Sequence, residues 1–215
     1  MRKMRAAIFD MDGTLLDSMD NWRRNNILLV RQMGIELTGE QEKDLYGLSG
    51  VLVVEYIKEN FGIDVPFPVL LQDSRQLMEE PYRRGIPLKP GARDYLRRLG
   101  ERGVKRVLCT ATSPHLALVA VNTADMVRDI DYVFSVDTIG GSKSKKDPAF
   151  FDLLCDFIGE KKEDCVMFED ALYAMKGARE AGLGVIGVMD ATNERDREAI
   201  IAICDQVIDS FDELE

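Results

Sequence analysis

Two aspartates stand one residue apart in the segment Asp10-Met11-Asp12-Gly13-Thr14, directly after the apolar run 6–9. The run predicts a short strand buried on both faces of a sheet, which Gly13 and Thr14 end. Residues i and i+2 of a strand point the same way, so we expect Asp10 and Asp12 to converge. Two like charges at that separation need a shared proton or a cation, and Mg²⁺ is the simplest hard cation for oxygen ligands.

Two simpler explanations apply to the same segment. Asp and Gly favour turns, so the residues could form a turn without chemistry. A calcium-binding EF-hand loop would need Gly at its sixth position and Glu at its twelfth. Counted from Asp10, these positions hold Leu15 and Asn21, which disfavours the calcium loop.

Further polar residues follow other predicted strands or precede a predicted helix. Each has an ordinary explanation alone: a hydroxyl in a turn, lysines in solvent, and acids that favour the dipole of the next helix. Because ligands bind beyond the carboxyl ends of parallel strands, we expect these side chains to share one site with Asp10 and Asp12. The set comprises Thr110, Glu169, Asp170, Lys143, Lys145 and Lys146.

The elements that must position these residues change character along the chain. Residues 17–84 show only helical patterns, punctuated by glycine and proline, at about 19–33, 38–46, 51–60 and 69–83. After a turn-rich segment at 85–91, strands alternate with helices, which predicts a parallel sheet covered on both faces. The strands are expected at about 6–9, 104–109, 132–135, 165–168, 185–188 and 207–208, and the later helices at 92–99, 113–123, 147–158, 171–181 and 193–203.

The composition argues against several classes of function. The chain has 215 residues and a net charge of −10, which disfavours nucleic acid and anionic membranes as partners. No apolar run approaches the ~20 residues of a membrane span. The apolar stretch after the N-terminal basic residues is too short for a signal peptide. We therefore expect a cytoplasmic protein with no nucleic-acid or membrane partner, as a monomer or weak dimer.

Cysteine and histidine usage disfavours zinc and Ser-His-Asp chemistry. His115 is the single histidine, and its expected role is in local structure. The four cysteines form no C-x-x-C pair and stand in apolar surroundings, so we expect reduced, buried packing residues. They are Cys109, Cys155, Cys165 and Cys204.

At these motifs the chain resembles the haloacid dehalogenase-like hydrolase superfamily, in the branch that includes β-phosphoglucomutase and many small-molecule phosphatases. The segment 10–14 is similar to the first motif, Thr110 to the second, and 168–170 with 178–182 to the fourth. In Lys145-Lys146-Asp147-Pro148 the family's K-P-x-P spacing selects Lys145, although Lys146 stands where the family often has proline. The resemblance implies a Rossmann-like, doubly wound α/β core from residues 1–16 and 87–215, with an inserted all-helical cap domain at 17–86.

The resemblance also implies a role for each motif residue. Asp10 would be the nucleophile that forms an aspartyl-phosphate, and Asp12 the general acid and base. Mg²⁺ would bind Asp10, the Asp12 carbonyl and Asp170, with Glu169 as a further ligand or a neighbouring partner. The implied phosphate-binding residues are Asp10, Met11, Asp12, Thr110, Ala111 and Lys145, with Met11 and Ala111 acting through backbone amides.

We therefore expect a Mg²⁺-dependent phosphatase that acts on a small phosphorylated metabolite. A sugar phosphomutase is the alternative enzyme. In the β-phosphoglucomutase pattern an arginine follows a G-x-S and a histidine stands on the first cap helix. Here Gly50 follows Gly47-Leu48-Ser49, and Trp22 takes the histidine position. Arginines such as Arg23, Arg24 or Arg75 could still supply the cationic grip a mutase needs.

Two non-catalytic alternatives also apply. A signalling receiver domain shares an aspartyl-phosphate, Mg²⁺, a Thr and a Lys, but it is about half this length and lacks a helical insertion. A phospho-ligand-binding protein of the same fold would be expected to have lost motif residues, whereas every motif position here holds a competent residue.

Overall fold

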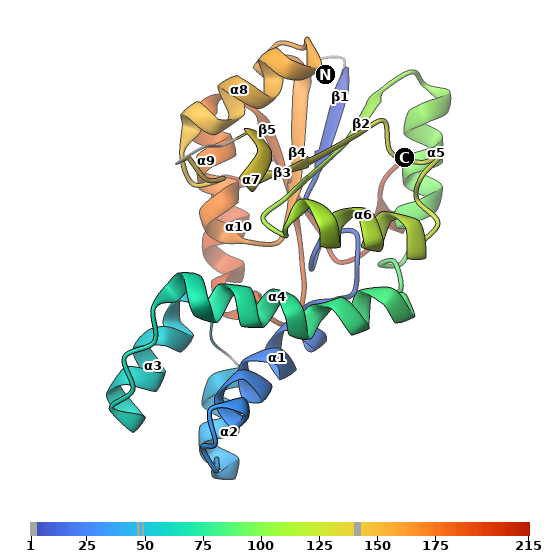
Figure 1. Cartoon of the computed structure of the whole chain (residues 1–215). Coiled ribbons are helices and arrows are strands. Elements are labelled where there is room, and N and C mark those ends of the chain that lie inside the picture. The colour runs from blue at the N-terminus through green and yellow to red at the C-terminus, as the bar shows by residue number, and fades with distance from the viewer. Residues whose placement is uncertain (1–3, 47, 49, 140–142) are drawn as a thin grey trace. The chain divides into compact units, whose positions relative to one another are not determined.

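The computed structural model describes residues 4–46, 48, 50–139 and 143–215 (Figure 1). Contacts divide the chain into two compact units. One unit comprises Met1–Asp17 and Ile86–Glu215, and the other comprises Ser18–Gly85. These limits lie within one residue of the boundaries expected from the sequence, and the assignment of a catalytic core and a cap to them stays a prediction.

A parallel sheet forms the centre of the first unit. Its order is β3-β2-β1-β4-β5-β6, and every neighbouring pair of strands is parallel. Phe9, the last residue of β1, pairs with Leu108 of β2 and Phe168 of β4, so these three strands end at nearly the same level. The strands are β1 (Ala6–Phe9), β2 (Lys105–Thr110), β3 (Tyr132–Ser135), β4 (Cys165–Glu169), β5 (Gly184–Val188) and β6 (Gln206–Ile208).

Helices cover both faces of this sheet, which confirms the predicted α/β fold. α8, α9 and α10 pack on the face that carries Ile8, Val107 and Met167. The helices of the unit are α5 (Ala92–Glu101), α6 (Pro114–Thr123), α7 (Val136–Ile139), α8 (Pro148–Ile158), α9 (Leu172–Ala181) and α10 (Arg197–Ile203), with 3-10 turns at Lys162–Asp164, Glu194–Asp196 and Phe211–Glu213. The sequence did not predict α7.

The opposite face carries an aromatic cluster. Phe9 stacks on Phe168 with ring centroids 4.5 Å apart, and Tyr95 of α5 and Phe211 pack around them. Such aromatic pairs add to the free energy of burial.

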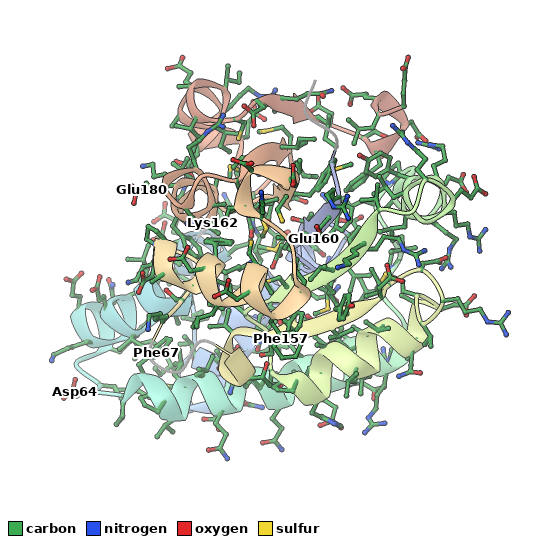
Figure 2. The ribbon with its side chains drawn as sticks, turned by 90° about the horizontal axis from the view of Figure 1, so that it is seen from above. Asp64, Phe67, Phe157, Glu160, Lys162 and Glu180 are labelled. Atoms are coloured by element: carbon green, nitrogen blue, oxygen red, sulfur yellow. The ribbon has the colours of Figure 1, made fainter. Side chains whose placement is uncertain are left out.

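At the sheet edge, Phe157 of α8, labelled in Figure 2, packs edge-on against Phe134 of β3, with ring centroids 4.8 Å apart.

The described residues of the second unit form the helices α1 (Met19–Gln32), α2 (Gly39–Tyr46), α3 (Gly50–Phe61) and α4 (Phe67–Arg84). Its core includes Leu29, Val30, Leu45, Val53, Ile57 and Leu70. α4 begins two residues before the expected position because Pro68 lies in its first turn, where a missing N–H removes no helical hydrogen bond. Gly47 and Ser49, used above to compare the chain with mutases, lie outside the described residues.

Buried asparagines hold these helices together. The side-chain amide of Asn25 donates to the Ser74 carbonyl at 2.9 Å, linking α1 to α4. The side-chain amide of Asn26 donates to the carbonyls of Leu45 and Leu48, both at 2.9 Å, linking α1 to the end of α2. Across the described residues, no helix has the length and apolar character needed to cross a bilayer.

The two segments that connect the units run side by side within the first unit. The Asp17 amide donates to the Pro87 carbonyl at 2.9 Å, and the Lys89 amide donates to the Leu15 carbonyl at 2.8 Å. Leu16 and Leu88 form an antiparallel bridge between them. The turn-rich segment predicted at 85–91 is therefore anchored to the residues that follow the DMDGT motif.

Candidate active site

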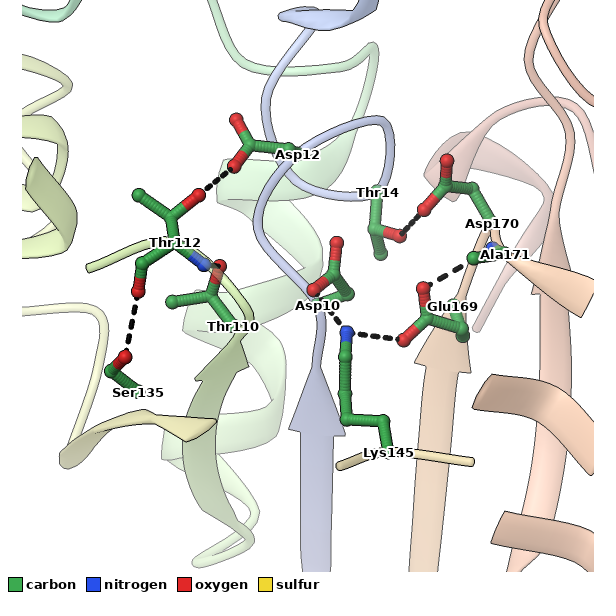
Figure 3. A network of polar contacts seen from close by, with 10 residues as sticks. All are labelled: Asp10, Asp12, Thr14, Thr110, Thr112, Ser135, Lys145, Glu169, Asp170 and Ala171. Carbon is green, nitrogen blue, oxygen red and sulfur yellow. Dashed lines mark hydrogen bonds and ion pairs between the residues drawn. The ribbon is translucent and has the colours of Figure 1, made fainter. Parts of the chain in front are cut away.

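The sheet brings the predicted site residues to one edge (Figure 3). Asp10 directly follows β1, Thr110 ends β2, and Glu169 ends β4, with Asp170 next in the chain. β1 lies between β2 and β4 in a parallel arrangement, so the carboxyl ends of the three strands are adjacent. Asp10, Thr110, Glu169 and Asp170 are all buried.

Lys145 lies among the carboxylates. Its side chain is only 2% exposed, and its ammonium contacts Asp10 Oδ1 and, at 2.7 Å, Glu169 Oε2. Lys146 is exposed and Lys143 is half-buried. The geometry therefore points to Lys145, the lysine that the K-P-x-P spacing selects.

A glycine of α9 permits this placement. A Cβ at Gly177 would lie 2.2 Å from the Lys145 carbonyl oxygen, far closer than packed atoms approach. The absence of a side chain at Gly177 lets α9 approach the loop that carries Lys145.

Three buried carboxylates, from Asp10, Glu169 and Asp170, each offer an oxygen within 4.8 Å of the others. Lys145 contacts two of these acids, so one positive charge faces three negative charges when all three acids are ionised. Burial and the Glu169 carboxylate raise the pKa of Asp10 to about 8, although Lys145 opposes the shift. Burial, Glu169 and Asp10 raise the pKa of Asp170 well above its ordinary value.

These raised pKa values show that ionising all three acids needs further positive charge, and a buried group of oxygen ligands of this kind fits a hard divalent cation such as Mg²⁺. The pKa of Lys145 is raised well above its ordinary value: burial alone would lower it, but Asp10 and Glu169 outweigh burial. Lys145 is therefore a cation at neutral pH.

The loop that carries Asp170 is held from two sides. Thr14 Oγ1 donates to Asp170 Oδ1 at 3.2 Å. The Asn193 side-chain amide donates to the backbone carbonyls of Asp170 at 2.9 Å and Val188 at 3.0 Å. These hydrogen bonds fix the Asp170 backbone and one oxygen of its carboxylate.

Asp12 lies three residues beyond the last residue of β1. β1 ends at Phe9, but the amide of Asp10 still donates to the Phe168 carbonyl of β4 at 2.9 Å, whereas Asp12 lies in the turn that follows. Among the described residues, the carboxylate of Asp12 is not part of the group formed by the other three acids. It faces Thr112, whose hydroxyl donates to Asp12 Oδ2 at 2.7 Å (Figure 3).

The remaining predicted phosphate-binding residues lie at the ends of β1 and β2. Thr110 Oγ1 accepts the Thr112 amide at 3.0 Å. Met11 lies in the turn after β1, where its carbonyl accepts the amide of Leu16 at 2.8 Å. Ala111 directly follows Thr110 and is exposed.

Four polar residues of this region were not predicted: Thr14, Thr112, Ser135 and Asn193. Thr14 belongs to the DMDGT segment and Thr112 stands two residues after Thr110, so both were within reach of the same strand-end argument. Ser135 ends β3, and its hydroxyl donates to the Thr112 carbonyl at 2.7 Å. Asn193 lies in the loop after β5, and no sequence pattern singles it out.

The cysteines lie apart from this chemistry. All four are free thiols; Cys109, Cys155 and Cys165 are buried and Cys204 is partly buried. Burial raises the pKa of Cys109 to about 12, which keeps this thiol protonated at neutral pH. The prediction of reduced packing residues is confirmed, except that Cys204 is less buried than expected.

Comparison with known proteins identifies the family. The profile of the haloacid dehalogenase-like hydrolases matches residues 4–182. Hexitol phosphatase B of Escherichia coli is 26% identical over 212 residues, which cover 94% of this chain and 90% of that protein. Phosphorylated carbohydrates phosphatase of Thermotoga maritima is 25% identical over 201 residues, with coverage of 89% and 88%.

Solved structures share the fold. The β-phosphoglucomutase of Clostridium difficile superposes with a TM-score of 0.73 at 17% identity, over 99% of this chain and 93% of that chain. A likeness at this identity concerns the fold, whereas the profile match covers the motifs read from the sequence. The chain therefore belongs to the haloacid dehalogenase-like hydrolase family, as its DMDGT segment and later strand-end motifs predict.

Proposed function

We propose that the protein is a Mg²⁺-dependent phosphatase that hydrolyses the phosphate monoester of a small metabolite through an aspartyl-phosphate at Asp10. One observation carries the proposal: Asp10 is buried at the end of the central strand, in contact with Lys145 and grouped with Glu169 and Asp170. A metabolite with hydroxyl groups is the favoured substrate, because the similar proteins are named for hexitol and carbohydrate phosphates.

In the first step, an oxygen of Asp10 attacks phosphorus. Lys145 contacts Oδ1, so we assign the attack to Oδ2. The new bond joins Oδ2 to phosphorus and the ester P–O bond breaks. Asp12 gives its proton to the leaving alkoxide, which departs as an alcohol.

In the second step, water attacks the aspartyl-phosphate. Asp12, now ionised, takes a proton from the water, the water oxygen bonds to phosphorus, and the bond from phosphorus to Asp10 breaks. Inorganic phosphate leaves, and Asp10 returns to its starting state.

The remaining residues bind the charged oxygens of the transferring group. We assign this role to the Lys145 ammonium, the Thr110 hydroxyl and the backbone amides of Met11 and Ala111. Mg²⁺ held by Asp10, the Asp12 carbonyl and Asp170 would supply further positive charge there. Glu169 accepts Lys145 through Oε2 and the Ala171 amide through Oε1, which favours its role as a partner of the lysine.

We further propose that the helical unit Ser18–Gly85 serves as a cap that selects the substrate. The cytoplasmic location and the monomeric or weakly dimeric state stay predictions.

A phosphate-release assay tests the proposed function. Purified protein is incubated with a panel of phosphorylated sugars, polyols, nucleotides and phosphoglycolate, with Mg²⁺ or with excess chelator. We expect Mg²⁺-dependent release from at least one ester and none from a matched Asp10→Asn sample. Release that persists in excess chelator, or in the Asp10→Asn variant, contradicts the proposal.

A second assay with the same protein distinguishes hydrolysis from transfer of the phosphoryl group within a sugar. It is incubated with β-glucose 1-phosphate and a trace of the bisphosphate. We expect free phosphate to form faster than glucose 6-phosphate, because Gly50 offers no charge where the mutase pattern has arginine. Faster formation of glucose 6-phosphate would assign a mutase.

A further inference from the structure

Thr112 is anchored on three sides at the end of β2. Its hydroxyl donates to Asp12 Oδ2 at 2.7 Å, and its amide donates to Thr110 Oγ1 at 3.0 Å. Its carbonyl accepts the hydroxyl of Ser135 at 2.7 Å. Thr112 is 7% exposed and Ser135 is 2% exposed, so little solvent competes for these bonds.

This anchoring ties a turn residue to the sheet. Asp12 lies beyond the end of β1, in the turn that follows the strand. Thr112 follows β2, and Ser135 pairs with Thr110 in the β2–β3 register. Through Thr112, the Asp12 carboxylate is held relative to two strands of the sheet (Figure 3).

The hydrogen bond also distinguishes the two oxygens of Asp12. An ionised carboxylate only accepts hydrogen bonds, and a protonated one still accepts at its unprotonated oxygen. In both states Oδ2 can accept the Thr112 hydroxyl, which favours the proton on Oδ1. The oxygen that gives and takes the proton is then the same in both steps of the reaction.

We propose that Thr112 is a positioning residue that orients Asp12 for proton transfer. The inference rests on the proposed function, in which Asp12 is the general acid and base. Thr112 acts through Asp12 and needs no contact with the substrate. A role limited to stabilising the turn would instead affect every substrate alike.

The test compares two leaving groups in the full-length protein. An alkoxide leaving group needs a proton from Asp12, whereas p-nitrophenolate is stable without one. The substrates are p-nitrophenyl phosphate and the sugar phosphate that the panel shows to be hydrolysed fastest. kcat/KM reports the steps up to formation of the aspartyl-phosphate, so the second step, common to both substrates, does not enter it.

Thr112→Val removes the hydroxyl and keeps the shape of the side chain. We expect kcat/KM for the sugar phosphate to fall about 10- to 100-fold, a part of the 10²–10⁴ that a general acid contributes. For p-nitrophenyl phosphate kcat/KM should change less than about threefold, while kcat falls because Asp12 must still activate water. The retained kcat/KM for the aryl ester shows that the variant is folded.

Two further variants complete the test. Thr112→Ser keeps the hydroxyl and should restore kcat/KM for the sugar phosphate to within about threefold of the wild type. Thr123→Val makes the same chemical change on the exposed face of α6 and should leave both substrates unaffected.

Equal loss on both esters, no loss on either, or failure of Thr112→Ser to restore the rate overturns the positioning role. If Thr112→Val fails to fold, kcat/KM for the two esters is compared in Thr112→Ser and Ser135→Ala instead. For Ser135→Ala we expect kcat/KM to fall for the sugar phosphate and not for p-nitrophenyl phosphate. The proposed function fails separately, if the wild type releases phosphate from neither ester or if Asp12→Asn hydrolyses the sugar phosphate normally.

Discussion

Lys145 lies between the carboxylates of Asp10 and Glu169 in a site with almost no exposure to solvent. A buried ammonium is costly unless it is paired, and here two acids pair with it. In the proposed reaction the same ammonium faces the phosphoryl oxygens. One side chain therefore lowers the repulsion between the acids and binds the transferring group.

Replacing Lys145 by methionine keeps the length of the side chain and removes its charge. We expect phosphatase activity to fall by about three orders of magnitude, because a preorganised cation at the transferring group is lost. The thermal midpoint in chelator should also fall, since the acids lose their cation. Lys146→Met, at the exposed neighbour, should retain activity within about twofold. Equal losses in the two variants, measured by phosphate release and thermal unfolding, would contradict the role given to Lys145.

At the scale of elements, the sequence predicted the strands because their apolar residues and the polar residues that follow them are local signals. The run Ala6–Phe9 is fully buried, and Asp147 caps α8 by accepting the Ala149 amide at 3.0 Å, as the Asp-Pro pair indicates. α7 was missed because four residues leave no helical periodicity.

The position of Lys145 depends on a contact that no local pattern reveals. Gly177 stands mid-helix in α9, where glycine usually costs stability, and its lack of a side chain makes room for the Lys145 carbonyl. The K-P-x-P spacing selects Lys145 from the sequence, but the burial of its side chain among the acids depends on the packing of α9 against the loop that carries it.

Gly177→Ala tests this packing. A methyl group at this position must displace the Lys145 backbone, so we expect a loss of about 1–3 kcal/mol in unfolding free energy and a fall in kcat. Gly39→Ala, at an open position of α2, should leave both quantities nearly unchanged. Chemical denaturation and phosphate release measure the two effects. Wild-type stability and kcat for Gly177→Ala would show that the close approach is unimportant.

Asp190 lies in the loop after β5 and is paired with a lysine. Its carboxylate contacts the Lys89 ammonium and accepts the Thr192 amide at 2.9 Å. Burial alone would raise the pKa of Asp190, but these hydrogen bonds outweigh burial and lower the pKa below its ordinary value. Because the folded pKa lies below the unfolded one, the stabilisation is complete above about pH 4 and is lost as the pH falls through the folded pKa.

Asp190→Asn should therefore lower the unfolding free energy by about 2 kcal/mol at pH 7, and by progressively less as the pH falls towards 3. Asp152→Asn breaks an exposed ion pair with Lys162 and should leave the unfolding free energy nearly unchanged, because solvent screens exposed pairs. Chemical denaturation at several pH values measures both. A deficit for Asp190→Asn that is independent of pH would refute the pairing.

At the scale of the whole molecule, the sheet unit contains the candidate site residues and the helical unit forms its own core. The sequence predicted this division because helical and alternating patterns occupy different segments. It did not predict the substrate, because substrate choice depends on the shape formed by side chains from several segments and no local spacing encodes that shape.

Mg²⁺ should stabilise the folded chain, and the choice of metal ion should decide whether the protein is active. The site offers the carboxylates of Asp10 and Asp170 and few other protein oxygens. This small number of ligands suits octahedral Mg²⁺, which retains several waters, whereas Ca²⁺ prefers more protein ligands. We expect saturating Mg²⁺ to raise the thermal midpoint of the wild type and not of Asp170→Asn, and Ca²⁺ to bind without supporting turnover. Equal turnover with the two ions, or an equal thermal shift in Asp170→Asn, would contradict this metal site.

In the proposed reaction, Asp10 becomes phosphorylated during turnover. The wild type is mixed with its substrate and Mg²⁺, quenched within milliseconds and treated with borohydride, which reduces an aspartyl-phosphate to homoserine. Peptide mass spectrometry then locates the change. The proposed function predicts homoserine at position 10 only when substrate is present. Homoserine at another position, or an unmodified Asp10 in samples trapped during active turnover, would contradict it.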